Sequence, residues 1–318
     1  MKRDATRIFQ RCPANPLMNV RDYPGIAQLY NPAPVQYGEE TILLISVVEH
    51  AAKHGYGRDV GQTRLARSRD GLHFELEETD FIGVQSEDYP YTLYHHFIDN
   101  RVTEIEGVYY IVTPVMARGF DSPVAMLGRT ADFRTYERLD IITQPPNRGA
   151  SLFPEKIGGK YWKLDRPGGG KGANADIWIS SSPDLLHWGG FMPLLAHNYR
   201  FWNAQKIGPT PPIRTEKGWL EIIHGVFSPA GGTAYYVGAI LLDLEQPWRI
   251  VGKTNSYLLA PEAGYERHGN CDNTVFPCGA IADREQDRLR LYYGACDQSI
   301  CLASGSLSEI VQACLDEI

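Results

Sequence analysis

Residues 180–190 read SSSPDLLHWGG, and this stretch, with its copies along the chain, decides the fold. A small or polar residue precedes an Asp, and an aromatic residue follows three or four positions later. The pattern occurs earlier as ARSRDGLHFE (66–75) and GRTADFRTYERL (128–139). An Asp in this position caps a tight turn by accepting backbone N–H groups. We therefore expect each copy to join two strands, with the aromatic residue packed between strands.

Weaker copies, LLDLEQPWRI (241–250) and LASGSLSEIV (302–311), extend the series to five. Runs rich in aromatic and β-branched residues, typical of strands, alternate with the copies. These runs cover residues 41–47, 108–112, 160–164, 219–224 and 288–293. Their spacing of roughly 50–70 residues suits four-stranded blades. The sequence thus predicts an all-β, five-bladed β-propeller, one domain over residues 1–318 with an N-terminal extension (1–25) and a short C-terminal helix (307–318).

Composition and charge restrict the possible functions. The 318 residues carry a net charge of −7, so we expect no general attraction to nucleic acid or to anionic membranes. No run approaches the ~20 apolar residues that span a bilayer, and the first residues lack the apolar core of a signal peptide. We expect a cytoplasmic protein. The six cysteines form no CxxC pair or zinc-type cluster, which favours buried free thiols and predicts neither a metal nor a cofactor.

A set of basic residues stands beside strand-like, Gly- and Pro-rich runs. The set consists of Arg148, Arg166, Lys206 and His224. If these side chains converge, they form an anion site, because Arg contacts phosphate oxygens in pairs and Lys supplies a point charge. One acid, Asp99, ends the aromatic-rich part of YHHFIDNRVTEI (94–105). The sequence therefore predicts an acid that faces a cationic pocket of phosphate size.

Several segments, among them LFPEKIGGKYWKLDRP (152–167), NTVFPCGA (273–280) and LYYGACDQSICLA (291–303), carry a resemblance to a known family. The chain resembles glycoside hydrolase family 130, the β-mannoside phosphorylases and related hydrolases, from about residue 31 to residue 297. The resemblance implies a five-bladed propeller enzyme and an inverting glycoside phosphorylase. Its substrates would be a β-mannoside and inorganic phosphate as co-substrate, and its products α-mannose 1-phosphate and a shortened acceptor. Family relatives form oligomers, so a homo-oligomer is expected.

The resemblance also implies roles for individual residues. Asp99, in IDNR where the family has a DPR-like motif, matches the proton donor, and the four basic residues match the phosphate contacts. The implied sugar contacts are Asn31, Arg64, Arg101, Asn273 and Asp297. The chain departs from the family at two sugar-contacting Arg positions, which hold Ser46 and Gln62; Arg64 is near enough to replace the second. Asp272 stands where the family has Pro and is a candidate specificity contact.

Alternatives to a phosphorylase remain at this point. An inverting hydrolase needs a second carboxylate to activate water, and Glu155 and Glu221 lie nearest in sequence to the basic residues. A sugar-binding propeller without catalysis would fit the altered sugar positions. A five-bladed glycosidase with three carboxylates is disfavoured, because LYNPAPV (29–35) contains no acid. The complete basic set favours the phosphorylase, since phosphate is itself an anionic nucleophile. Four aromatic residues could line the sugar cleft or fill the core: Tyr94, His95, His96 and Trp202.

Overall fold

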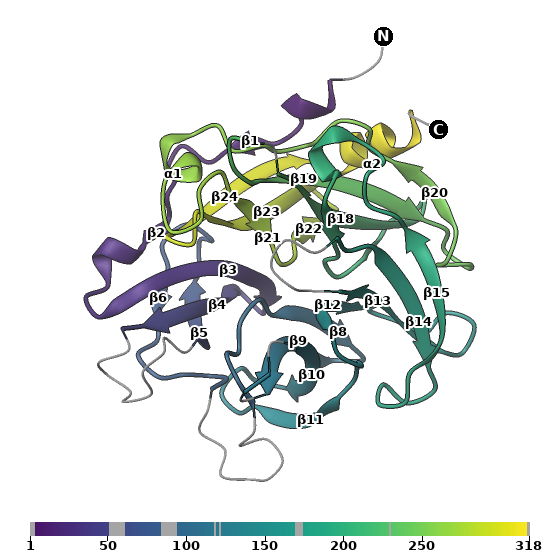
Figure 1. Ribbon diagram of the computed structural model, residues 1–318, viewed down its shortest axis with the longest axis horizontal. Coiled ribbons are helices and arrows are strands. Elements are labelled where there is room, and N and C mark those ends of the chain that lie inside the picture. Colours follow the sequence, from purple (N-terminus) through teal and green to yellow (C-terminus); the bar gives the residue numbers. More distant parts are fainter. Residues whose placement is uncertain are drawn as a thin grey trace.

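The computed structural model describes residues 4–50, 61–83, 94–117, 119–120, 122–168, 174–228 and 230–316. Its strands form five antiparallel sheets that surround a common axis (Figure 1). Within each sheet the strands follow one another in chain order from the axis outward, except at the outer edge of the last sheet. Each sheet is therefore one blade, and the predicted five-bladed β-propeller is confirmed.

The blades have the following strands. The first contains β3 (Ile26–Tyr37), β4 (Glu40–Glu49), β5 (Gly61–Ser68) and β6 (Glu75–Leu76). In the second, β7 (Tyr94–His95) and β8 (Arg101–Ile105) share the inner position before β9 (Val108–Ala117), β10 (Pro123–Thr130) and β11 (Glu137–Ile141). The third contains β12 (Asn147–Leu152), β13 (Tyr161–Pro167), β14 (Ile177–Ser182) and β15 (Gly189–Leu195).

The last two blades follow the same plan. The fourth places β16 (Lys206–Gly208) and β17 (Ile213–Arg214) inside β18 (Trp219–Phe227), β19 (Ala234–Leu242) and β20 (Ile250–Lys253). The fifth places β21 (Val275–Pro277) and β22 (Ile281–Asp283) inside β23 (Arg288–Ala295) and β24 (Ser299–Ser306). Short helical turns connect them: η1 (Ala5–Arg7), η2 (Val20–Asp22), η5 (Phe201–Asn203) and α1 (Gly264–Arg267).

The sequence repeats mark equivalent positions in the blades. Each predicted strand run belongs to the second strand of a blade, and four of the Asp-containing copies connect the third strand to the fourth. In the copy at 180–190, Asp184 Oδ1 accepts the backbone N–H groups of Leu186 and His187 at 2.9 and 2.8 Å. Asp70, Asp132 and Asp243 make the same pair of bonds. The predicted turn caps are confirmed.

The aromatic residue of the repeat packs between blades. The Phe74 ring meets Tyr292 of the fifth blade edge to face, with centroids 5.8 Å apart. Trp188 packs against a cluster that contains Ile105 and Val112 of the second blade. The aromatic positions therefore join neighbouring sheets.

The fifth copy ends in a helix because the chain's own beginning supplies the missing outer strand. Ser306 Oγ accepts the N–H of Glu309 and caps α2 (Leu307–Leu315), which confirms the predicted C-terminal helix. Outside β24 lie β1 (Gln10–Arg11) and β2 (Met18–Asn19), both antiparallel to it (Figure 1). Part of the segment interpreted as an N-terminal extension thus completes the fifth blade and closes the ring.

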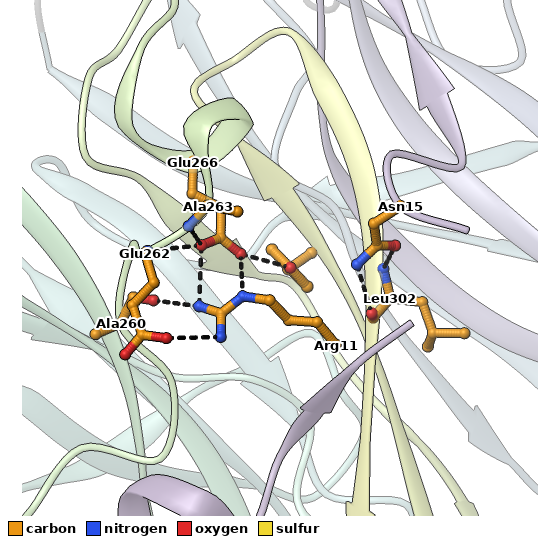
Figure 2. Close-up of polar contacts among 8 residues, drawn as sticks. Arg11, Asn15, Ala260, Glu262, Ala263, Glu266 and Leu302 are labelled. Atoms are coloured by element: carbon orange, nitrogen blue, oxygen red, sulfur yellow. Dashed lines mark hydrogen bonds and ion pairs between the residues drawn. The ribbon is translucent and has the colours of Figure 1, made fainter. Parts of the chain in front are cut away.

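A buried ion pair fixes this closure (Figure 2). Arg11 donates from Nε and Nη2 to the two carboxylate oxygens of Glu266, at 2.8 and 2.9 Å. The Glu266 side chain is fully buried and also accepts from the N–H groups of Glu262 and Ala263 and from the Tyr293 hydroxyl. Nearby, Asn15 exchanges two hydrogen bonds with the backbone of Leu302. Every oxygen of the buried carboxylate is therefore satisfied, as burial of a charge requires.

Two further features of the described structure concern membrane-spanning helices and the state of the cysteines. Among the described residues, no helix has the length and apolar character needed to cross a membrane. All six cysteines are free thiols, as expected, and four of them are buried.

Candidate active site

A cavity of about 730 Å³ lies where the blades meet. Its lining includes Asn31 from the first blade, Asp99 from the second, Arg148 and Arg166 from the third, Lys206 from the fourth and Asp297 from the fifth. Because all five blades contribute, the cavity lies on the propeller axis. Six of the ten predicted site residues are brought together by strands far apart in sequence, and Arg101 is a seventh.

Four of the polar lining residues have left-handed backbone: His96, with a φ of 66°, and the following three. Asn31, Asp99 and Asp297 have φ values of 48°, 55° and 54°. Asn and Asp tolerate this region better than other residues, and such conformations gather at functional sites. At Asn31 the pairing of β3 with β4 slips by a residue, and Gly294 allows the approach of β23, since a Cβ there would lie 2.6 Å from the Asn31 nitrogen.

Asp99 lies in the loop between β7 and β8 and is buried. Its backbone N–H donates to Ser46 Oγ at 2.9 Å, and Asn31 Nδ2 donates to its Oδ1 at 2.6 Å. Burial raises the pKa of Asp99, but Arg148, Arg101 and the Asn31 hydrogen bond outweigh it and leave the pKa below its ordinary value. The carboxylate is therefore ionised and held rigidly at the cavity wall. Ser46, one of the two departures from the family, fixes the acid's backbone.

Four cations, Arg101, Arg148, Arg166 and Lys206, share the cavity with this ionised acid. Arg148 Nη2 lies 3.3 Å from Asp99 Oδ2, and its side chain is 44% exposed. Burial, together with Arg148 and Arg101, lowers the pKa of Arg166 to about 10. Burial, followed by Arg166 and Arg148, lowers the pKa of Lys206 to about 8. Cations that depress one another's pKa values lack enough negative charge nearby, so the arrangement favours an anion.

His224 lies behind the cationic pocket and outside the cavity lining. Arg166 Nη1 lies 3.2 Å from His224 Nε2, and a guanidinium can only donate, so Nε2 accepts. Burial and the cations Arg166 and Arg101 lower the pKa of His224 well below its ordinary value, so the ring is neutral. Gly208 makes room for it, since a Cβ there would lie 2.1 Å from Cε1. The geometry thus gives His224 the role of orienting Arg166.

The other predicted sugar contacts lie in different surroundings. Arg101 lines the cavity, where Nη1 donates to the Asp99 carbonyl at 2.5 Å and Nε to the Pro209 carbonyl at 3.1 Å. Arg64 is outside the described lining; it pairs with Glu49 at 2.7 Å and Asp80 at 2.9 Å. Its guanidinium is thus already engaged by two carboxylates.

Three more residues that the resemblance connects with sugar binding lie outside the described lining. Gln62 is buried in β5. Asn273 accepts the Tyr235 N–H with its carbonyl, beside the lining residue Thr274. Asp272 is exposed and accepts the Gly269 N–H at 2.9 Å. Asp272 therefore caps a turn at the surface.

The carboxylates considered for a hydrolase lie away from the cavity. Glu155 is half exposed and pairs with Arg214 at 3.3 Å. Glu221 is fully buried in β18, and burial raises its pKa well above the ordinary value, so it is a neutral acid. Neither belongs to the described lining. Trp202 is fully buried against Gly225 and Gly238, and Tyr94 is partly buried against a core cluster between blades. Neither ring belongs to the described lining.

Asp297 is the second carboxyl group of the described cavity lining. Burial, followed by repulsion from Asp99, raises the pKa of Asp297 to about 7. Two carboxyls whose pKa values are driven apart can hold one proton between them at neutral pH. Asp297 can thus either donate to or accept from a sugar hydroxyl.

Sequence reasoning missed part of the lining, which includes Gln28, Tyr30, Gln205, Tyr235, Thr274 and Phe276. Gln28 and Tyr30 lie two apart on β3 and share a face. Strand alternation alone would put Asn31 on the other face, and the three meet at the cavity where the register of β3 shifts between Tyr30 and Ala33. Nothing in the local sequence distinguishes Tyr235, which the Lys206 ammonium approaches to 5.3 Å from the ring centroid. In the described part of the chain, no three His, Cys, Asp or Glu side chains gather into a metal-binding group.

The propeller and its axial cavity, with an acid opposite a cationic pocket, define a five-bladed β-propeller with an anion site. The family model of glycoside hydrolase family 130, described as β-1,4-mannooligosaccharide phosphorylase, matches residues 2–316. The chain belongs to this family.

Curated relatives agree. The chain is 38% identical to a β-1,2-mannobiose phosphorylase of Listeria innocua over 259 residues, 80% of this chain and 69% of the relative. It is 31% identical to a β-1,4-mannooligosaccharide phosphorylase of Ruminococcus albus over 312 residues, 97% and 91% of the two chains. The solved Listeria innocua β-1,2-mannobiose phosphorylase, in complex with β-1,2-mannobiose, superimposes with a TM-score of 0.85 at 29% identity over 97% of this chain and 99% of that one.

Proposed function

We propose that the protein is an inverting phosphorylase that cleaves a β-mannoside with inorganic phosphate, giving α-mannose 1-phosphate and a shortened acceptor. The observation that carries this is the set of three cations, Arg148, Arg166 and Lys206, around a cavity that also holds Asp99. The relatives named as β-mannoside phosphorylases support the same reaction. Water as a nucleophile has no use for such a pocket, whereas phosphate requires it.

The residues can divide the chemistry as follows. A phosphate oxygen forms the new bond to the anomeric carbon from the face opposite the departing oxygen, which inverts the configuration. The bond between the anomeric carbon and the leaving oxygen breaks, and that oxygen receives a proton supplied by Asp99. Arg148, Arg166 and Lys206 hold the phosphate, so most of the rate enhancement comes from positioning and electrostatics.

Phosphate also prepares the acid. Without it, Arg148 pairs with Asp99 and helps to hold the carboxyl pKa low. A bound phosphate competes for the Arg148 guanidinium and adds negative charge nearby. Both effects favour protonation of Asp99, so we expect its pKa to rise when phosphate binds. Asp99 therefore carries the proton that it donates once the phosphate nucleophile has bound.

The test is product formation from β-1,2- and β-1,4-linked mannobiose with and without phosphate. Mannose 1-phosphate should form only with phosphate, and both Asp99→Asn and Arg166→Ala should lose this activity. Gly231→Ala, in open space on the surface, serves as the matched control. Free mannose released at the same rate without phosphate would show a hydrolase, with Asp297 as the carboxyl to examine as its base.

A further inference from the structure

His96 lines the active-site cavity and has no part in the chemistry above. It lies three positions before Asp99, with a left-handed φ of 66°. The same ring lines a smaller space of about 50 Å³ whose other walls include Pro114, Val115 and Met116. His96 therefore stands between the main cavity and an apolar recess in the second blade.

The hydrogen bond from Gly61 fixes the tautomer of this ring. The Gly61 backbone N–H donates to His96 Nδ1 at 3.1 Å, so Nδ1 carries no proton. Burial, followed by Arg148, lowers the pKa of His96 to about 4, so the ring is neutral at physiological pH. Its one proton must then lie on Nε2. Gly61 is needed for this contact, because a Cβ there would lie 3.0 Å from Nδ1 and 2.5 Å from Ile98 Cγ2.

The Nε2–H group is available to a ligand. Within residues 61–83, 94–117 and the rest of the described chain, the only hydrogen bond of the ring is the one at Nδ1. Nε2 is also absent from the buried polar atoms that lack a partner, so it reaches open space. A neutral, pre-oriented donor thus belongs to the lining of the cavity that holds Asp99 and the cations.

We propose that His96 binds the sugar unit that is cleaved, by donating Nε2–H to a hydroxyl oxygen beside Asp99. This inference rests on the proposed function. Before phosphate binds and Asp99 is protonated, a sugar hydroxyl can accept from His96 and donate to the Asp99 carboxylate at the same time. Accepting one hydrogen bond polarises the hydroxyl and strengthens the bond that it donates. A phosphate oxygen fits this place less well, because the neighbouring Asp99 carboxylate repels it.

The variant His96→Asn separates the two nitrogens. Asn tolerates the left-handed backbone, and its side-chain oxygen can still accept the Gly61 N–H. Only the donor at Nε2 is lost. We expect kcat/KM for mannobiose to fall roughly three- to tenfold, the usual cost of one uncharged donor, with the KM for phosphate unchanged. His95→Asn, at a residue outside the described lining, is the matched control and should keep the wild-type constants.

A second measurement is independent of turnover. In ¹⁵N-histidine spectra of the Asp99→Asn protein, His96 should carry its proton on Nε2, and saturating mannobiose should shift that signal. A proton on Nδ1, no shift with mannobiose, or a raised KM for phosphate in His96→Asn would each overturn the inference. If the wild-type enzyme shows no phosphate-dependent cleavage while mannobiose still shifts Nε2, the proposed reaction is wrong and the role of His96 stands.

Discussion

Lys206 gives the phosphate site an upper pH limit. Its pKa is lowered to about 8 by burial and by Arg166 and Arg148. Phosphate binding needs the charged ammonium, so affinity should fall as the pH rises through this value. One pH unit above the pKa, about one tenth of the lysine is protonated, so the dissociation constant should be about tenfold larger than below the pKa, a change of about 1.4 kcal/mol. Inorganic phosphate and Asp297 take up their protons below this pKa, so the lysine is the group that changes its charge just above it.

The assay is calorimetric titration with phosphate from this pKa to about one pH unit above it, where Lys206 loses its proton and Arg166 keeps its own. Lys206→Arg should bind phosphate with little pH dependence, because the guanidinium stays charged. Lys206→Met should bind weakly throughout and should lack the slope. Phosphate binding to the wild type should also take up protons above the pKa, which appears as a dependence of the measured heat on the buffer. The same slope in the wild type and in Lys206→Met would refute the reasoning.

Three further predictions concern stability and positioning. Arg11→Met leaves the buried Glu266 carboxylate without its cation and should lower the free energy of unfolding by about 3–5 kcal/mol. The double variant Arg11→Met/Glu266→Gln should recover part of this loss. An unchanged denaturation midpoint in Arg11→Met would contradict the prediction. Because the paired Glu266 has a lowered pKa, the wild type should lose this contribution as the pH falls through the folded-state pKa, and Arg11→Met should lose less. Gly225→Ala places a Cβ 2.4 Å from Trp202 Cε3 and should cost about 1–3 kcal/mol in a thermal unfolding experiment, while Gly231→Ala should cost nothing measurable. Ser46→Ala leaves the buried Asp99 N–H without its acceptor and should reduce kcat while the dissociation constant for phosphate stays the same; an equal loss of phosphate affinity would place Ser46 in the anion site instead.

The blade plan could be predicted because its signals are local and repeated. Asp70, Asp132, Asp184 and Asp243 each cap a turn at the same place in a blade, so one pattern in the sequence reports on four separate connections. The outer edge of the fifth blade could not be predicted in this way. β1 and β2 have two residues each, too few for strand periodicity, and their partner lies at the other end of the chain.

The active site, too, could be predicted only in part from the sequence. The resemblance to the family located Asp99 and the cations, because their types and neighbours persist in short motifs. It could not show which side of a strand a residue faces. The contacts of His224 and Arg64 with substrate therefore stay predictions, while in the structure His224 lies against Arg166 and Arg64 pairs with Glu49 and Asp80. The position of such a side chain depends on packing between blades, and a local sequence motif carries no information about that packing.

The ring closure has a consequence for synthesis in the cell. Asn15 and Leu302, which bind one another, are 287 positions apart, so β1 and β2 stay without their partner until β24 has been synthesised. Throughout translation, the nascent chain carries a short unpaired strand and the unpartnered Arg11. A message truncated before β24 would yield four finished blades with a gap that another chain's strand could enter. We therefore expect a copy that lacks β24 to associate with other chains through this open edge.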